Sequence, residues 1–128
     1  MRLSRLRVVS AAVIPLVFLA ACGSGKTDAS AANARRNRLV RRIRAREGSA
    51  PSGEGPFDVV LANLIASLLV TLADGLVADL RPGGTLLASG IFVNREAEVI
   101  AAFESRGLVI ADRWSEGEWI ALEVRRPA

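Results

Sequence analysis

The 128-residue sequence contains no histidine, no tyrosine and a single cysteine, Cys22. The lack of histidine excludes a histidine-based catalytic triad and a histidine metal site, and one cysteine cannot form an internal disulfide. Long apolar runs are also missing. The longest, residues 8–21, covers fourteen positions and contains Pro15, whereas a membrane-spanning helix needs about 20 apolar residues. The length leaves room for one domain.

Positive and negative charge are unevenly distributed along the chain. Residues 1–50 hold eleven Lys and Arg against two acidic residues, a net charge of +9, whereas residues 51–128 hold six against eleven, a net charge of −5. The overall charge of +4 therefore combines a basic first half with an acidic second half.

The first 22 residues have the order of a secretory signal. Three arginines in "MRLSRLR" precede the apolar stretch, which ends in Leu19-Ala20-Ala21-Cys22 and resembles a bacterial lipobox. In a lipobox the cysteine is lipidated, so Cys22 is a lipidation candidate that would anchor the chain to a membrane. We predict a signal-peptide-like segment over residues 1–21 and a flexible, Arg-rich linker over residues 22–56. A buried apolar helix with one free cysteine is the alternative.

The "GKT" at residues 25–27 belongs to the phosphate-loop pattern G-x-x-x-x-G-K-[ST]. The position five residues before Gly25 is Ala20 instead of glycine, and no clear strand precedes the loop. A strand before the loop and a helix after it are what bring backbone N–H groups together on a phosphate. The pattern therefore does not predict a nucleotide-binding loop.

Seven arginines lie in "NARRNRLVRRIRAREG", residues 33–48. An arginine-rich arm can bind nucleic acid electrostatically, but this one has no aromatic residue on which a base could stack. The pattern favours a solvated helix end that runs into a strand over residues 42–46. No specific nucleic-acid binding is expected.

Regular periodicity begins at Pro56 and predicts an α/β domain over residues 57–128. "FDVVLAN" (57–63) is a short apolar run typical of a parallel strand buried on both faces. Residues 65–80 carry leucines at the spacings of an amphipathic helix, which Arg81-Pro82-Gly83-Gly84 is predicted to end.

The rest of the domain predicts three further β runs and one helix. A strand is expected over residues 85–93, and a helix over 94–107 with Asn94 as its N-cap. A hairpin is expected around Glu116-Gly117-Glu118. The resulting order, β-α-β-α-β-β, indicates a mostly parallel sheet with a C-terminal antiparallel hairpin.

Three segments of this domain are distinctive: "GPFDVVLANLIAS" (55–67), "LRPGGTLLASGI" (80–91) and "EGEWIALEVRR" (116–126). They resemble the second half of class I S-adenosylmethionine-dependent methyltransferases, and in particular the PrmA enzymes, which methylate the stalk protein L-eleven of the large ribosomal subunit. Weaker similarity upstream, including "ANARRN" (32–37), extends the resemblance to roughly residues 31–128. It implies a partial class I methyltransferase sheet of Rossmann-like fold and a cytoplasmic location.

The resemblance implies a role for Asn63. In PrmA enzymes the Asn after this strand contacts the methyl donor, S-adenosyl-L-methionine, and lies beside the acceptor amine. A neutral amide can hydrogen-bond an amine without fixing it as a cation, and ligands of open α/β sheets bind beyond the carboxyl ends of strands. The alternative is that Asn63 caps the following helix.

Other parts that the resemblance implies are not found in the sequence. "CGSG" (22–25) mimics the glycine loop that binds the methionine end of the donor, but only eleven positions separate Cys22 from Asn33. That distance is too short for a helix, a strand with a ribose-binding acid and the next helix. Without those strands, the strand at residues 57–62 is expected to expose an apolar edge. Arg38 and Arg41 stand where a turn glycine and an acidic residue are expected.

The sequence therefore favours a truncated S-adenosylmethionine-dependent methyltransferase, inactive alone, of the type that methylates lysine or N-terminal amines of a ribosomal protein. The alternative is a membrane-anchored lipoprotein with a small non-catalytic α/β domain. The two hypotheses differ in location, because the methyl donor and ribosomal proteins are cytosolic whereas a lipobox directs export.

Overall fold

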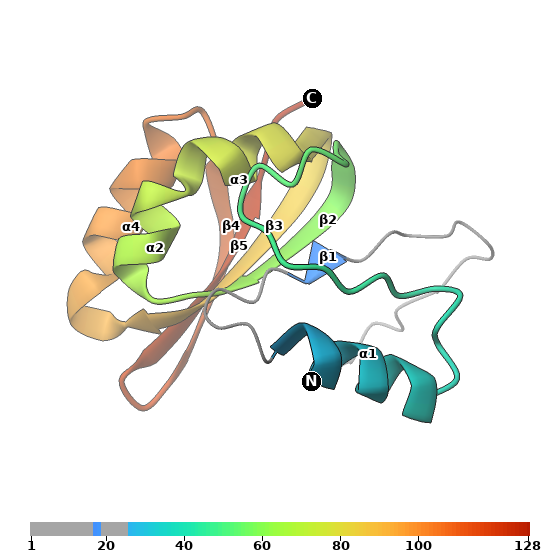
Figure 1. Cartoon of the computed structure of the whole chain (residues 1–128). Coiled ribbons are helices and arrows are strands. Elements are labelled where there is room, and N and C mark those ends of the chain that lie inside the picture. Colours follow the sequence, from blue (N-terminus) through green and yellow to red (C-terminus); the bar gives the residue numbers. More distant parts are fainter. Residues whose placement is uncertain (1–16, 19–25) are drawn as a thin grey trace, which may run out of the picture.

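The structure, a computed structural model, describes residues 17–18 and 26–128 (Figure 1). A single five-stranded sheet has the order β1-β2-β3-β5-β4. The strands are β1 Val17–Phe18, β2 Phe57–Asn63, β3 Leu80–Phe92, β4 Val109–Glu116 and β5 Trp119–Arg125. The helices are α1 Lys26–Arg36, α2 Ala66–Thr71, α3 Ala73–Asp79, the short 3₁₀ helix η1 Val93–Arg95 and α4 Glu96–Glu104.

The sheet is parallel on one side and antiparallel on the other. β1 pairs parallel with β2, and β2 pairs parallel with β3. β5 then pairs antiparallel with both β3 and β4. The expected α/β domain, with parallel strands and a C-terminal antiparallel hairpin, is confirmed.

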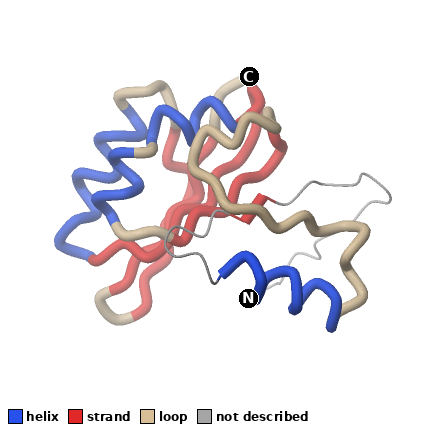
Figure 2. Tube along the Cα trace, viewed as in Figure 1, coloured by secondary structure: helices blue, strands red, loops and turns tan. Residues whose placement is uncertain are grey.

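The hydrophobic core lies between the sheet and three helices. Figure 1 and Figure 2 show α2, α3 and α4 together on one side of the sheet, with α1 apart from them. Leu69 and Leu76 from these helices and Phe103 from α4 are fully buried against strand residues such as Leu86 and Ile91. Burying a side chain of this size contributes about 1.5–3 kcal/mol, so this layer holds the C-terminal half together.

Three details of the C-terminal half differ from expectation. The expected helix over residues 65–80 is broken at Leu72, whose φ of −93° and ψ of 4° separate α2 from α3. β3 begins at Leu80, five residues early, because Leu80 already pairs with Phe57 of β2; the Arg126 N–H also bonds the Gly84 carbonyl oxygen at 3.0 Å. Asn94 does not cap α4, whose N-cap is Arg95 without a side-chain hydrogen bond.

The N-terminal half differs more. α1 lies within the residues expected to form a flexible linker. The strand expected over residues 42–46 is absent, since residues 43–49 form neither helix nor strand. β1 pairs with β2 at Val60 and Leu61, so the β2 edge that was expected to be exposed has a neighbour there. None of the helices in the described part of the chain is long and apolar enough to cross a membrane.

Candidate functional site

Asn63 is the last residue of β2 and lies at the carboxyl end of the parallel part of the sheet. Its register partner on β3 is Ser89, and the backbone N–H of Leu64 donates a 3.0 Å hydrogen bond to the Ser89 carbonyl oxygen. β2 and β3 are therefore held together at this end. The Asn63 side chain is exposed, at the sheet edge where open α/β folds bind ligands.

Gly90 shapes the surroundings of Asn63. A Cβ atom at position 90 would lie 2.7 Å from Asn63 Oδ1 and 3.0 Å from the Leu64 carbonyl oxygen, closer than normal van der Waals contact. Gly90 also has a φ of +80°, which side-chain-bearing residues rarely adopt. Both its backbone conformation and the space that it leaves for Asn63 therefore require glycine.

The interpretation of Asn63 as a helix cap is wrong. The N-cap of α2 is Ile65, in an extended conformation with φ −63° and ψ 153°, and no side chain caps the helix. Within residues 17–18 and 26–128, the Asn63 amide has no hydrogen-bond partner. Its oxygen and its NH₂ group can therefore both bind a ligand.

Exposed apolar residues lie at the same end of the sheet. The exposed fraction is 61% for Ile65, 44% for Val93 and 55% for Trp119. Trp119 packs edge-on against Phe92, with ring centroids 5.5 Å apart and an interplanar angle of 86°. This end of the sheet therefore combines an amide that has no partner in the described part of the chain with accessible apolar and aromatic area.

β1 and α1 flank the "CGSG" sequence. β1 runs parallel to β2, so both strands point their carboxyl ends in the same direction, and α1 begins at Lys26. A strand followed by a helix is the order that a ligand-binding glycine loop requires. The loop itself and Cys22, the lipidation candidate, lie outside the described residues.

Two ion pairs hold α4 in place. Arg106 donates to Asp74 from Nε at 2.6 Å and from Nη2 at 3.1 Å, which lowers the pKa of that carboxyl and links α3 to the end of α4. Arg113 on β4 likewise hydrogen-bonds Glu96 at the start of α4, which lowers the pKa of Glu96. These pairs join secondary-structure elements, and Asn63 takes no part in them.

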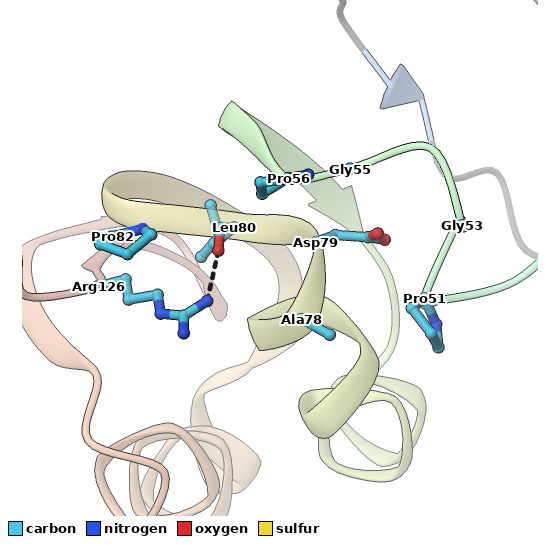
Figure 3. A pocket seen from close by; sticks show the side chains of 9 residues that line it. All are labelled: Pro51, Gly53, Gly55, Pro56, Ala78, Asp79, Leu80, Pro82 and Arg126. Atoms are coloured by element: carbon cyan, nitrogen blue, oxygen red, sulfur yellow. Dashed lines mark hydrogen bonds between the residues drawn. The ribbon is translucent and has the colours of Figure 1, made fainter.

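A hollow of about 330 Å³ lies at the opposite end of β2 and β3 from Asn63 (Figure 3). Its polar side chains already have partners. The buried Asp79 carboxylate accepts bonds from the Ser52 N–H, at 2.8 and 3.0 Å, and from the Ser52 hydroxyl at 2.9 Å. Arg126 donates to the carbonyl oxygens of Val77 and Leu80. The hollow is therefore a stabilised loop junction, and Asn63 remains the better candidate site.

Comparison with known proteins identifies the family. The model of the family described as ribosomal protein L11 methyltransferase (PrmA) matches residues 24–127. The chain belongs to this family. The resemblance of residues 55–67, 80–91 and 116–126 to PrmA enzymes is thereby confirmed.

Individual relatives agree with the family assignment. The ribosomal protein L11 methyltransferase of Chloroflexus aurantiacus is 53% identical over 74 residues, which cover 58% of this chain and 23% of that protein. The one from Pelotomaculum thermopropionicum is 35% identical over 128 residues, which cover 99% of this chain and 39% of that protein. The chain thus spans less than two fifths of the length of these relatives.

Solved structures support the same fold. The ribosomal protein L11 methylase of Lactobacillus delbrueckii subsp. bulgaricus superposes with a TM-score of 0.76 at 25% identity, over 83% of this chain and 55% of that one. A tRNA methyltransferase of B. subtilis has a TM-score of 0.64 at 13% identity, over 83% of this chain and 47% of that one, and shows the fold alone.

The comparisons give no support to a signal peptide or a lipoprotein. The alignment with the Pelotomaculum protein covers 99% of the chain, so it includes the segment over residues 1–21 that was expected to be a signal.

Gly90 is the site residue that the sequence did not predict. The available signal was the "SG" pair in "LRPGGTLLASGI", within one of the segments that resemble the PrmA family.

Proposed function

We propose that this L11 methyltransferase-family chain uses Asn63 to contact S-adenosyl-L-methionine and to orient an acceptor amine of ribosomal protein L11, a lysine or the N-terminus. The observation that carries the proposal is the Asn63 amide, which has no hydrogen-bond partner among the described residues and lies at the carboxyl ends of two parallel strands, in the space left by Gly90. The chain is proposed to be located in the cytoplasm, where ribosomal proteins are made.

The chemistry of Asn63 suits this role. Bound S-adenosyl-L-methionine would supply a methyl group on a positively charged sulfur. Asn63 Oδ1 can accept a hydrogen bond from an uncharged amine, and orientation of the reacting groups accounts for much of the rate in a direct displacement. Because the amide is neutral, it does not favour the ammonium form, which has no lone pair for attack. A carboxylate at this position would favour that form.

The 128-residue chain alone is proposed to bind the donor weakly and not to turn over. β1 pairs directly with β2, and α1 starts at Lys26, so the described residues include no further strand that could carry a ribose-binding acid. At this end of the sheet the described residues supply the Asn63 amide and the neighbouring Ser89, but no acidic residue on a strand beside β1. A dissociation constant near 1 mM, or about −4 kcal/mol, is the expected order of magnitude.

Two measurements test these statements separately. Isothermal titration with S-adenosylhomocysteine at micromolar concentrations should detect no binding heat. A dissociation constant in the micromolar range would refute the weak-binding proposal. Incubation with tritiated S-adenosyl-L-methionine and purified L11 should give no label above background. Label on L11 that disappears in Asn63→Ala but persists in Asn37→Ala, an exposed control in the turn after α1, would contradict inactivity yet support the methyltransferase function.

A further inference from the structure

We propose that the basic segment, defined as residues 35–46, binds the phosphodiester backbone of nucleic acid without reading its sequence. The segment comprises the end of α1 and the turns and extended chain that follow it, and its seven arginines are all exposed. Figure 1 and Figure 2 show this part of the chain apart from the layer of α2, α3 and α4. The inference does not rest on the proposed methyltransferase function.

Most of this charge has no acidic partner among the side chains that the structure describes. Among these, Arg44 and Arg46 have one, Glu54, at 3.8 and 3.7 Å. The other five arginines have no carboxylate within 4.0 Å in the described part of the chain; they are Arg35, Arg36, Arg38, Arg41 and Arg42. Residues 26–48 carry eight basic and two acidic residues, a net charge of +6, so the segment repels itself unless an anion binds.

Arg38 gives a second, independent indication. Its φ is +58°, and it is the only residue other than glycine with a positive φ in the described chain. The Leu39 N–H bonds the Ala34 carbonyl oxygen at 2.8 Å and the Arg38 N–H bonds that of Arg35 at 3.0 Å, a Schellman cap with Arg38 at the left-handed position. Glycine is preferred there, and the α4 cap uses Gly107 in the same way. An arginine at a position that favours glycine points to a function for its charge.

The apolar residues of the segment favour nucleic acid over a membrane. Ala34, just before it, is buried, and Leu39 and Ile43 are half-buried, so these side chains offer little apolar area to a membrane. Only Val40, which is 57% exposed, could enter a lipid surface, whereas interfacial helices need a continuous apolar face. Residues 26–56 contain no aromatic side chain for base stacking, so phosphate contacts alone would carry the binding.

The salt dependence of binding tests the proposal. The probe is a fluorescently labelled, mixed-sequence 20-nucleotide RNA, with the same sequence as DNA in a second arm, and anisotropy is measured between 50 and 200 mM KCl. Five phosphate contacts predict a slope of about −3.5 in log K against log salt, or about 100-fold weaker binding over this range. RNA and DNA share the phosphodiester backbone, so binding of either one supports the proposal. The ratio of the two affinities shows which nucleic acid the segment prefers.

Variants place the contact on the segment. Arg41→Gln/Arg42→Gln should reduce the slope by about 1.4, whereas the control Arg95→Gln/Arg125→Gln, which removes two exposed arginines elsewhere, should leave it unchanged. Arg38→Gly should weaken binding while raising the urea midpoint, which a misfolded variant cannot do. The proposal is overturned by equal slopes for the two double variants, by no binding at 50 mM KCl, or by tighter binding to phosphatidylserine vesicles or polyglutamate. Sedimentation showing salt-dependent self-association in place of RNA binding would also overturn it.

Discussion

Replacing Gly90 with alanine tests the geometry around Asn63. The added Cβ atom would lie 2.7 Å from Asn63 Oδ1 and 3.0 Å from the Leu64 carbonyl oxygen. The substitution also requires an alanine at a φ of +80°, which costs about 1–2 kcal/mol. Movement of Asn63 and of the backbone to relieve the two contacts adds about 1–3 kcal/mol. The expected loss of unfolding free energy is therefore about 2–5 kcal/mol.

Gly107→Ala is the matched control. Gly107 has a φ of +76°, and a Cβ atom there would meet nothing within 4 Å. It should therefore lose only the conformational part, about 1–2 kcal/mol. Urea unfolding followed by circular dichroism measures both variants. If the two losses are equal, the close approach of position 90 to Asn63 and Leu64 does not contribute, and the reasoning is refuted.

A double-mutant cycle separates the side-chain contact from the backbone contact. In Asn63→Ala the Oδ1 atom is absent, so Gly90→Ala should cost about 1 kcal/mol less than in the original chain. The Leu64 carbonyl oxygen and the positive φ remain in both backgrounds. A coupling energy of zero would show that the Asn63 amide turns away at no cost, and that Gly90 does not fix its position.

Three further predictions concern stability. Arg38→Gly should stabilise the fold by about 1 kcal/mol in urea unfolding, because glycine adopts the φ of +58° without strain, and a loss of stability would contradict the cap assignment. Asp79→Ala should destabilise it by about 2–3 kcal/mol, because the Ser52 N–H and hydroxyl lose their buried acceptor, whereas exposed Glu104→Ala should change little. The Arg113 hydrogen bond lowers the pKa of Glu96, so its contribution, at most about 1 kcal/mol, is present at neutral pH and lost as pH falls below about 4.3. The urea midpoint of the original chain should therefore fall as the pH is lowered through this range. In Glu96→Gln, which has no carboxylate to protonate at this position, that part of the fall should be missing.

The C-terminal fold could be predicted because its signals are local. Apolar runs of strand length, the helical spacing of leucines and the turn at Gly117 are all contained in short windows of sequence. The break at Leu72 could not be predicted, since the apolar pattern continues through it. The early start of β3 could not be predicted either, because it depends on pairing with Phe57 of β2 and on backbone bonds of Gly83 and Gly84 to Arg126, both distant in sequence.

The N-terminal half was harder to predict because its two elements give ambiguous signals. β1 is two residues long and is defined by pairing with β2, whereas the same apolar run also satisfies the pattern of a secretory signal. α1 lies in a run of small residues that resembled a flexible tether, although alanine, the best helix former, occupies four of its eleven positions. For β1, the pairing with β2 is information that the local sequence does not contain.

The candidate site could be predicted only in part. The position of Asn63 followed from its place at the end of an apolar strand and from the family resemblance. The contribution of Gly90 required knowing that β2 and β3 are adjacent and that Asn63 is level with Ser89. No pattern within either strand alone contains that relation.

The most direct test of the central claim, that Asn63 contacts the methyl donor, is a ¹H–¹⁵N NMR titration of the chain with S-adenosylhomocysteine. The account predicts saturable shifts of the Asn63 side-chain amide and of the Leu64 and Gly90 backbone amides at millimolar ligand. In Asn63→Ala the shifts of Leu64 and Gly90 should weaken, whereas in Asn37→Ala they should not change. Shifts confined to other residues, or shifts at Gly90 that are identical in Asn63→Ala, would contradict the account.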